Sequence, residues 1–203
     1  MKLYYATGTC SLSPDIVACE ASVPLDLERV DIRKLPHVTG KGDDYSAVNP
    51  SGYVPALLLD DGSVLTEGVA IVQDLADLRP GSGLAPAAGT TERVALQSWL
   101  NFIAIELHKM FSPGLFHPEY GMQAQEVARA RIAQRLAHVE RHLAAAGPFL
   151  LGETFADADA YLFTIVGWSD FAKVDLCAFP QLRNFQARVG ERPAVRRRCT
   201  PKA

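Results

Sequence analysis

The chain of 203 residues is long enough for one large domain or two small ones with real cores. Its apolar content of 48% and charged content of 21% are typical of a globular protein, and a net charge of -3 gives no sign of nucleic-acid binding. No apolar run approaches the roughly 18 residues of a membrane span, and no signal-peptide pattern precedes the first strand, so we expect a cytoplasmic protein without membrane contact. Four cysteines, at positions 10, 19, 177 and 199, form neither CxxC pairs nor zinc spacing, which predicts free thiols and no metal.

The first segment of the chain predicts a strand, a polar loop and a helix. Lys2 to Tyr5 is the strand, and the helix is expected from Ser11 to about Ala21. Cys10 lies where the loop meets the helix. The amides and the dipole at a helix start are expected to lower the pKa of its thiol.

Cys10 opens a CxxS tetrapeptide that ends at Ser13, so no second thiol lies one turn away. Such a cysteine cannot close a local disulfide. Its natural partner is an external thiol, held as a mixed disulfide or as a hydrogen-bonded thiolate. The other interpretation is a small buried apolar side chain, which we adopt for Cys19 inside the helix, whereas we favour a functional thiol at Cys10.

A second strand follows over residues 25–32, where apolar and charged side chains alternate, and it is expected to run parallel to the first. The loop over residues 33–48 is polar and contains glycine, with at most one helical turn around residues 44–47. These elements complete a βαβ unit.

The next stretch, residues 49–80, predicts a loop, a hairpin and a helix. Two short apolar strands within residues 56–66 flank an Asp-Asp-Gly turn, and a helix then begins near Glu67. The first turn of that helix offers unpaired amides and a positive dipole end, so the region of Glu67 and Gly68 is a seat for a ligand carboxylate. The Glu67 side chain either stabilises the helix end or accepts hydrogen bonds from a ligand ammonium group.

Val54 and Pro55 stand directly before the hairpin. The proline removes one ladder donor, and with a cis bond the Val54 backbone would turn outward and pair with an extended peptide. Because only about one X-Pro bond in twenty is cis in folded proteins, a trans bond is the default expectation.

A proline- and glycine-rich stretch over residues 80–89 is the predicted linker, and everything after it is expected to be helical. The expected helices are a long one from Thr90 or Thr91 through Phe111, a second over 124–146, an almost wholly apolar core helix over 157–170, and two short ones over 180–189 and 193–198.

The first of these helices carries polar side chains at helical spacing. Asn101, Ile105 and His108 are expected to share one face, with Glu106 and Lys109 beside it. His108 can donate to a sulfur or to a peptide; the alternative is a histidine that is hydrogen-bonded at the seam between the two halves.

Together, these motifs resemble the glutathione S-transferase family. Val54-Pro55, the apolar strand, the Asp-Asp-Gly turn and the LTEGVAIVQDLAD helix are similar to the glutathione-binding half of these enzymes, and the cysteine tetrapeptide is similar to the bacterial beta class. The resemblance implies a glutathione S-transferase fold. It consists of a thioredoxin-like α/β domain with βαβ-ββα order over residues 1–79, the linker over 80–89, and an all-α domain over 90–203.

The resemblance also implies roles for individual residues. Cys10 and His108 are the expected catalytic residues, and a basic residue soon after the second strand is expected to meet the glycine carboxylate of glutathione. Lys34 is the best match and Lys41 is the other candidate, although most loop lysines are simply solvated. The expected glutathione contacts are Ser11, Lys34, Val54, Pro55, Glu67, Gly68, Asn101 and Lys109.

The sequence departs from the family pattern at two places. Ile105 stands where many relatives have a hydroxyl residue that reaches the ligand of the adjoining subunit. At the core helix, Ala156 stands in place of the Ser or Thr of a capping box, which costs about 1 kcal/mol, while Asp159 is retained. We expect Asp157 or Thr154 to substitute as the cap.

The expected function is conjugation of glutathione, the co-substrate, to hydrophobic electrophiles by a homodimer without a resident cofactor. Cys10 is expected to be able to form a mixed disulfide with glutathione. Thiol-disulfide oxidoreductase or reductive dehalogenase activity is one alternative, and non-catalytic binding of a ligand or a protein is another. The electrophile pocket is expected between the halves, where four aromatic residues either line it or belong to the core: Phe111, Phe116, His117 and Trp168.

Overall fold

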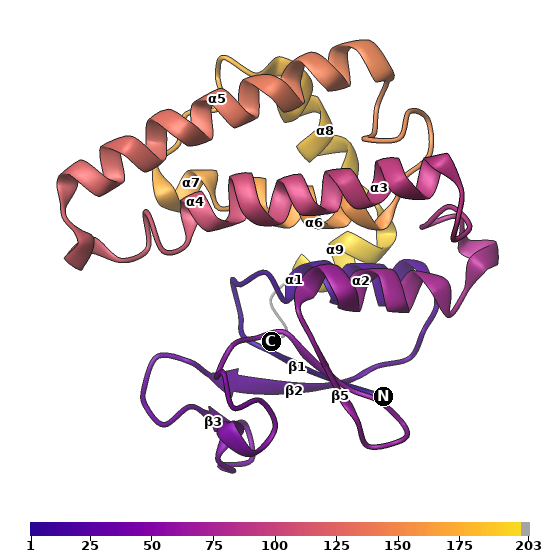
Figure 1. Ribbon diagram of the computed structural model, residues 1–203, viewed down its shortest axis with the longest axis vertical. Helices are drawn as coiled ribbons and strands as arrows, with labels where there is room; N and C mark the ends of the chain where they lie inside the picture. The colour runs from indigo at the N-terminus through magenta and orange to yellow at the C-terminus, as the bar shows by residue number, and fades with distance from the viewer. Residues whose placement is uncertain (200–203) are drawn as a thin grey trace.

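The computed structural model describes residues 1–199, with the backbone alone for residues 198 and 199, so the expected free thiol of Cys199 lies outside the described side chains. The first part of the chain forms a five-stranded sheet in the order β3-β2-β1-β4-β5 (Figure 1). Its strands are β1 (Lys2–Tyr5), β2 (Asp26–Asp31), β3 (Val38–Thr39), β4 (Ala56–Leu58) and β5 (Val64–Thr66). Strands β1 and β2 are parallel, and the other neighbouring pairs are antiparallel. The predicted βαβ-ββα order is confirmed, but β3 was missed because two residues are too few to show a period of two.

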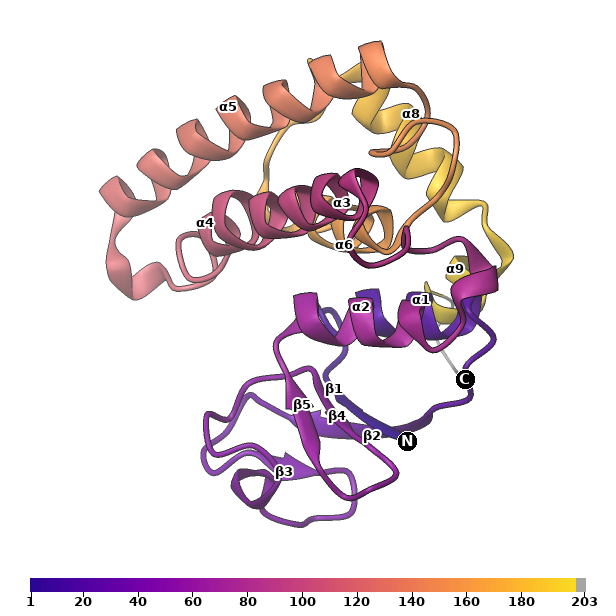
Figure 2. The same ribbon diagram turned by 45° about the vertical axis from the view of Figure 1, so that its right-hand side comes forward.

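The sheet has a buried cluster on each face. The helices of this part are α1 (Leu12–Glu20), the 3-10 helix η1 (Tyr45–Ala47) and α2 (Gly68–Asp77). On the face covered by α1 and α2, which is turned toward the helical domain (Figure 2), Leu3 and Leu57 are fully buried. On the opposite face, Tyr4 and Ala56 pack with Tyr45 of η1. Neighbouring residues of β1 and of β4 thus point to opposite faces, as the pleat of a strand requires.

After residue 79, the regular elements that the structure describes are all helical, which confirms the expected second half. They are η2 (Pro80–Ser82), α3 (Thr91–Phe102), η3 (Ile103–His108), α4 (Lys109–Phe111), η4 (Pro118–Tyr120), α5 (Met122–Ala146), α6 (Asp157–Val166), α7 (Ser169–Ala172), α8 (Pro180–Gly190) and α9 (Pro193–Cys199). In both ribbon views α3 and α6 lie between the α1 and α2 pair and the outer helix α5 (Figures 1 and 2). None of the described helices is both long enough and apolar enough to cross a membrane.

The expected helix from Thr90 or Thr91 to Phe111 is confirmed as an unbroken helical run, but its C-terminal part includes a π-helix. The Thr90 hydroxyl caps α3 as predicted and accepts a backbone N–H at 3.2 Å. Element η3, however, is a π-helix with more residues per turn, so α-helical spacing does not apply across it. Ile105 is 60% exposed, whereas His108 is partly buried, and the face that Asn101, Ile105 and His108 were expected to share stays a prediction.

The apolar core helix is also shorter than expected, because α6 ends at Val166 and α7 follows after a turn. At its start, the Asp159 carboxylate accepts the Ala156 and Leu150 amides at 2.8 and 2.9 Å, so this half of the capping box is retained.

The expected replacement of the lost cap is wrong. No side chain caps α6 at Ala156: Thr154 is exposed, and the Asp157 carboxyl makes no capping hydrogen bond. Asp157 is instead fully buried at the seam, where its amide donates to the Leu84 carbonyl at 2.9 Å. Leu84 belongs to the predicted linker and is 3% exposed, so that segment packs into the core.

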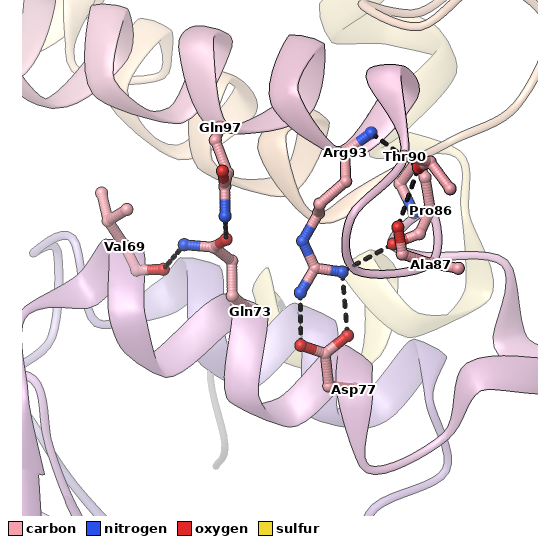
Figure 3. Close-up of polar contacts among 8 residues, drawn as sticks. All are labelled: Val69, Gln73, Asp77, Pro86, Ala87, Thr90, Arg93 and Gln97. Atoms are coloured by element: carbon pink, nitrogen blue, oxygen red, sulfur yellow. Dashed lines mark hydrogen bonds and ion pairs between the residues drawn. The ribbon is translucent and has the colours of Figure 1, made fainter.

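The seam between the sheet domain and the helical domain is held by polar contacts from α3 to α2 (Figure 3). The Arg93 guanidinium forms a bidentate ion pair with Asp77, in which one nitrogen lies 2.9 Å from a carboxylate oxygen, and it also donates to the Pro86 carbonyl at 2.6 Å. One turn further along α3, Gln97 donates to the Gln73 side chain at 3.1 Å. These contacts place the C-terminal end of α2 against the N-terminal half of α3.

Candidate active site

The Cys10 thiol lies in the loop that precedes α1, beside the segment that precedes β4. Its Sγ donates a hydrogen bond to the Val54 carbonyl at 3.5 Å. Within the loop, Thr9 Oγ1 donates to a carbonyl at 2.8 Å, and Ser13 Oγ donates to the Cys10 carbonyl at 2.9 Å. The hydroxyl of Ser13, the last residue of the CxxS tetrapeptide, therefore fixes the backbone of Cys10 and does not bind its sulfur.

The prediction that the helix start lowers the pKa of the Cys10 thiol is wrong. Burial raises the pKa of the Cys10 thiol to about 11, against the smaller effects of its backbone hydrogen bond and of Lys109, and Glu67 raises it further. Desolvation disfavours the thiolate more than the helix start favours it. The sequence predicted the helix start, but it did not reveal the coverage of the sulfur by the folded chain. The Cys10 thiol is consequently protonated at neutral pH.

The bond between Val54 and Pro55 is cis, so the default trans expectation is wrong. For X-Pro bonds the trans preference is only about 0.5–1 kcal/mol, too small for local sequence to decide the isomer. The carbonyl of the preceding residue, Tyr53, accepts from the Tyr45 hydroxyl at 2.9 Å and from the Asn49 amide at 2.8 Å. These two bonds fix the segment that faces the Cys10 sulfur.

The N-terminus of α2 lies next to this segment. A Cβ added at Gly68 would lie 3.8 Å from Pro55 Cγ, so Gly68 borders the proline ring. Glu67 has a φ of +67°, a backbone conformation that costs about 1 kcal/mol or more in a residue with a side chain and that concentrates at functional sites. Its exposed side chain makes no capping hydrogen bond to α2. The first amides of α2 have no acceptor one turn earlier and can bind a carboxylate.

One lysine of the helical domain lies at this segment, and two further candidates lie in the sheet domain after β2. Lys109, from the helical domain, places its Nζ 5.9 Å from the centre of the exposed Tyr53 ring. Lys41 lies 3.6 Å from a Glu28 carboxylate oxygen and is already paired. Lys34 is exposed in the loop between β2 and β3. Lys34 therefore stays the better of the two candidates for the glycine carboxylate, as a prediction.

His108 lies at the seam, where its Nδ1 is 2.7 Å from the Tyr161 hydroxyl. Burial lowers the pKa of His108 to about 4, and the neighbouring Lys109 ammonium acts in the same direction, so the imidazole is neutral at physiological pH. The Trp168 ring packs edge-on against it with centroids 5.0 Å apart. Trp168 Nε1 in turn donates to the Gly8 carbonyl at 3.0 Å, which ties the helical domain to the loop of the thiol.

Aromatic side chains extend from His108 into the helical domain. Trp168 packs on Phe111 and Phe116 at centroid distances of 6.0 and 5.1 Å, and Phe116 packs on Phe171 at 5.6 Å. Phe111 is fully buried and belongs to the core, whereas Phe171 is 80% exposed. His117 is turned outward and pairs with Glu119 at 2.7 Å. Of the four predicted lining residues, Phe116 and Trp168 are the two that are partly buried, and their contact with an electrophile stays a prediction.

Two predicted contacts are not brought to the thiol by their side chains. Asn101 is exposed on α3 and donates to the Gln97 carbonyl of its own helix at 2.8 Å. Ser11 is 1% exposed, and its hydroxyl lies 2.9 Å from Thr9 Oγ1. Both groups make local hydrogen bonds, and their contact with glutathione stays a prediction.

Several residues of the site were missed from the sequence. Tyr45, Asn49 and Tyr53 hold the segment of Val54, and Tyr161 meets His108. Tyr161 lies 53 residues from its partner in an apolar helix, so no local pattern marks it. The Asn-Pro-Ser-Gly turn signal at residues 49–52 was the one available hint for the first three.

Potential metal ligands and free thiols both occur in the part of the chain that the structure describes. There, no three His, Cys, Asp or Glu side chains are grouped so that they could hold an ion. The three cysteines with described side chains are Cys10, Cys19 and Cys177, all free thiols.

A thioredoxin-like α/β domain joined to a helical domain, with a cysteine at the start of its first helix, defines a class of thiol-binding proteins. The family profile described as glutathione S-transferase, N-terminal domain, matches residues 9–78, and the profile of the C-terminal domain matches residues 121–197. The chain is 43% identical to the glutathione S-transferase GstA of Escherichia coli O157:H7 over 195 residues, which cover 96% of this chain and 95% of that protein.

Solved structures agree with this relationship. A ternary complex of BphK, a bacterial glutathione S-transferase, is 50% identical, with a TM-score of 0.94 and coverage of 98% of this chain and 97% of that one. A sphingomonad glutathione S-transferase complexed with glutathione is 39% identical, with a TM-score of 0.92 and coverage of 98% and 96%. The chain belongs to the glutathione S-transferase family and is an enzyme of that family.

Proposed function

We propose that the protein binds glutathione across Val54 and the N-terminus of α2 and conjugates its sulfur to a hydrophobic electrophile. The observation that carries this proposal is the position of the Cys10 sulfur, 3.5 Å from the Val54 carbonyl, in the loop tied to Trp168 of the helical domain. An extended tripeptide that pairs with the Val54 backbone would bring its own thiol to this point. The sphingomonad relative is a complex with glutathione, which supports the same ligand here.

The charges around the sulfur are suited to a zwitterionic tripeptide. The amides at the start of α2 favour the γ-glutamyl carboxylate, the exposed Glu67 carboxylate favours the ammonium group, and Lys34 favours the glycine carboxylate. Lys109 supplies a cation on the side of the helical domain, where its charge favours anionic sulfur at Cys10.

Cys10 acts first as a hydrogen-bond donor in this proposal. Because its pKa is about 11, its S–H is present at neutral pH and can turn from the Val54 carbonyl to a bound glutathione thiolate. His108 is neutral and supplies a second donor. Stabilisation of the thiolate by fixed donors and by the Lys109 charge then favours attack on the electrophile.

Formation of a mixed disulfide is the finer part of the proposal. When glutathione disulfide occupies the groove, the Cys10 thiolate attacks one sulfur of the S–S bond. The Cys10–glutathione disulfide forms and one glutathione thiolate leaves, which takes up the proton that Cys10 lost. Because the last residue of the motif is Ser13, which donates to the Cys10 carbonyl, the motif has no second thiol that could resolve this disulfide. Thiol-disulfide exchange is therefore the second candidate activity.

Replacing Cys10 by alanine tests these two activities together. We expect C10A to lose exchange with disulfide substrates by at least about 100-fold, because no nucleophile remains, and to keep transfer to an aryl halide within about 10-fold. The exchange and transfer rates are measured on the same preparation, and C177A, which changes an exposed thiol outside the groove, is the matched control.

Two outcomes would contradict the proposal. Exchange that survives in C10A would place the reactive thiol elsewhere. Absence of glutathione binding to the wild-type protein by calorimetry would favour a non-catalytic binder of other ligands.

The remaining proposed partners are an electrophilic substrate and a second copy of the chain. The aromatic cluster that ends at the exposed Phe171 suits an apolar electrophile whose identity a turnover screen would establish. We also propose a cytoplasmic homodimer, to which the exposed Val94 of α3 and the exposed Ile105 of η3 would contribute apolar surface. Light scattering of the purified protein decides the oligomeric state.

A further inference from the structure

Tyr161 makes a hydrogen bond to His108 that the proposed reaction does not use. It lies on α6, is 3% exposed, and its hydroxyl is 2.7 Å from His108 Nδ1, with the two rings at 81°. Among the residues that the structure describes, this nitrogen is the one hydrogen-bond partner of the hydroxyl. A buried hydroxyl without an acceptor for its proton is costly, by about 1–3 kcal/mol, so the Tyr161 proton must be directed at His108.

The direction of this hydrogen bond determines where the imidazole carries its own proton. A neutral imidazole has one N–H and one acceptor nitrogen. If Tyr161 donates to Nδ1, that nitrogen is the acceptor and the ring proton is on Nε2. In the opposite arrangement Nδ1–H would donate to the tyrosine oxygen, and the buried hydroxyl would have to find a second acceptor.

We infer that Tyr161 is a positioning residue that fixes His108 as the Nε2–H tautomer and so makes the imidazole a hydrogen-bond donor toward the bound sulfur. The inference rests on the proposed function for the identity of that sulfur, but the tautomer itself belongs to the unliganded protein. Burial, followed by the charges of Cys10 and Glu67, raises the pKa of Tyr161, so the phenol keeps the proton that it donates.

The charges of Cys10 and Glu67 both act on the Tyr161 phenol, so the negative charge of a bound thiolate would act on it as well. A hydrogen bond from Tyr161 directly to a glutathione thiolate is thus the competing arrangement, with His108 Nδ1–H donating to the tyrosine oxygen. The two arrangements predict opposite tautomers of His108, and this makes them distinguishable.

Nitrogen-15 NMR of the imidazole in the unliganded wild-type protein is the direct test. The chain has five histidines, and the spectrum of H108Q identifies the signals of His108 by difference. We expect an unprotonated Nδ1 and a protonated Nε2 at pH 7. In Y161F, which removes one oxygen and keeps the ring, we expect both nitrogens to shift toward averaged values, whereas Y120F, at an exposed tyrosine, changes nothing.

Kinetics then connect the tautomer to the reaction. We expect Y161F to lower kcat for conjugation by about 10-fold with the KM for glutathione changed less than about 2-fold, and to have no further effect in the H108Q background. A protonated Nδ1 in the wild-type protein, or equal losses from Y161F in both backgrounds, would overturn the inference. If conjugation were absent altogether, the wild-type tautomer would still decide it, because that measurement needs no substrate.

Discussion

The two ends of the seam between the domains are held by different chemistry. At the C-terminal end of α2, a buried arginine on α3 reaches across to Asp77 in a bidentate ion pair, and Gln97 meets Gln73 beside it (Figure 3). At the N-terminal end of α2, where Glu67 and the thiol lie, the cross-domain ties are weaker. They are the Trp168 hydrogen bond to Gly8 and the lysine over the Tyr53 ring.

This difference allows one end of the seam to be rigid while the other admits a ligand. Charged pairs that are partly desolvated are stronger and more specific in geometry than a single neutral hydrogen bond. A second charged pair joins Arg192 of the helical domain to Glu20 of α1 at 2.7 and 2.8 Å, and it also holds the two domains together. With the domains fixed in this way, the thiol end can leave backbone amides and an exposed carboxylate available for a peptide.

Removing Asp77 should have the largest effect on stability. In D77A the Arg93 side chain, which is 7% exposed, loses its bidentate partner, and we expect the free energy of unfolding to fall by about 2–3 kcal/mol. Urea denaturation measures the change. Q97A removes the exposed neutral contact next to it, and its expected cost is below about 0.5 kcal/mol. Equal losses of unfolding free energy in D77A and Q97A would show that the ion pair does not hold the C-terminal end of α2 against α3.

The buried carboxyl of Asp157, at the same end of the seam, makes the stability of the protein depend on pH. Burial raises the pKa of its carboxyl to about 7, against the opposing effects of the nearby Ala158 amide and of Arg93, while Asp159 and Asp77 raise it further. Between the ordinary value near 3.8 and about 7, the folded state holds a proton that the unfolded state has lost, so stability falls as pH rises through this window.

The substitution D157N removes this titration. We expect the variant to gain roughly 2 kcal/mol of stability over the wild-type protein between pH 5 and pH 8, measured by urea denaturation at both values. A difference between variant and wild type that does not change with pH would mean that Asp157 is already ionised in the folded protein at pH 5.

A smaller effect is expected at the thiol end. W168F keeps an aromatic ring against His108 but removes the N–H that reaches Gly8, so stability should fall by about 1 kcal/mol and kcat/KM for conjugation by about 5-fold. W99F is the matched control, since Trp99 packs on Phe102 and two histidines of α5. If W99F lowered kcat/KM as much as W168F, the tie to Gly8 would have no special role.

The fold was predictable wherever it is encoded locally. The Asp-Asp-Gly turn, the short apolar strands and the Thr90 cap all lie within a few residues of the structure that they determine. The π-helix at residues 103–108 was not predictable, because its residues are ordinary helix formers and the bulge depends on packing. The domain boundaries at residues 79 and 90 stay a prediction.

The site was predictable only in part, for a related reason. Cys10, Val54 and Gly68 were identified because each lies at a helix start or next to a proline. The Tyr161 contact to His108 and the Trp168 contact to Gly8 span 53 and 160 residues, and sequence patterns carry no information on such pairs. The pKa of Cys10 was predicted in the wrong direction for the same reason, since its main cause is burial by the folded chain.

The position of glutathione at the thiol end is the central claim of this account. A crystal structure of the wild-type protein soaked in glutathione tests it most directly. We predict that the tripeptide pairs with the Val54 backbone, with its γ-glutamyl carboxylate at the Gly68 amide and its sulfur in contact with Cys10 Sγ. Glutathione bound elsewhere, with the Cys10 sulfur still donating to the Val54 carbonyl, would contradict the account.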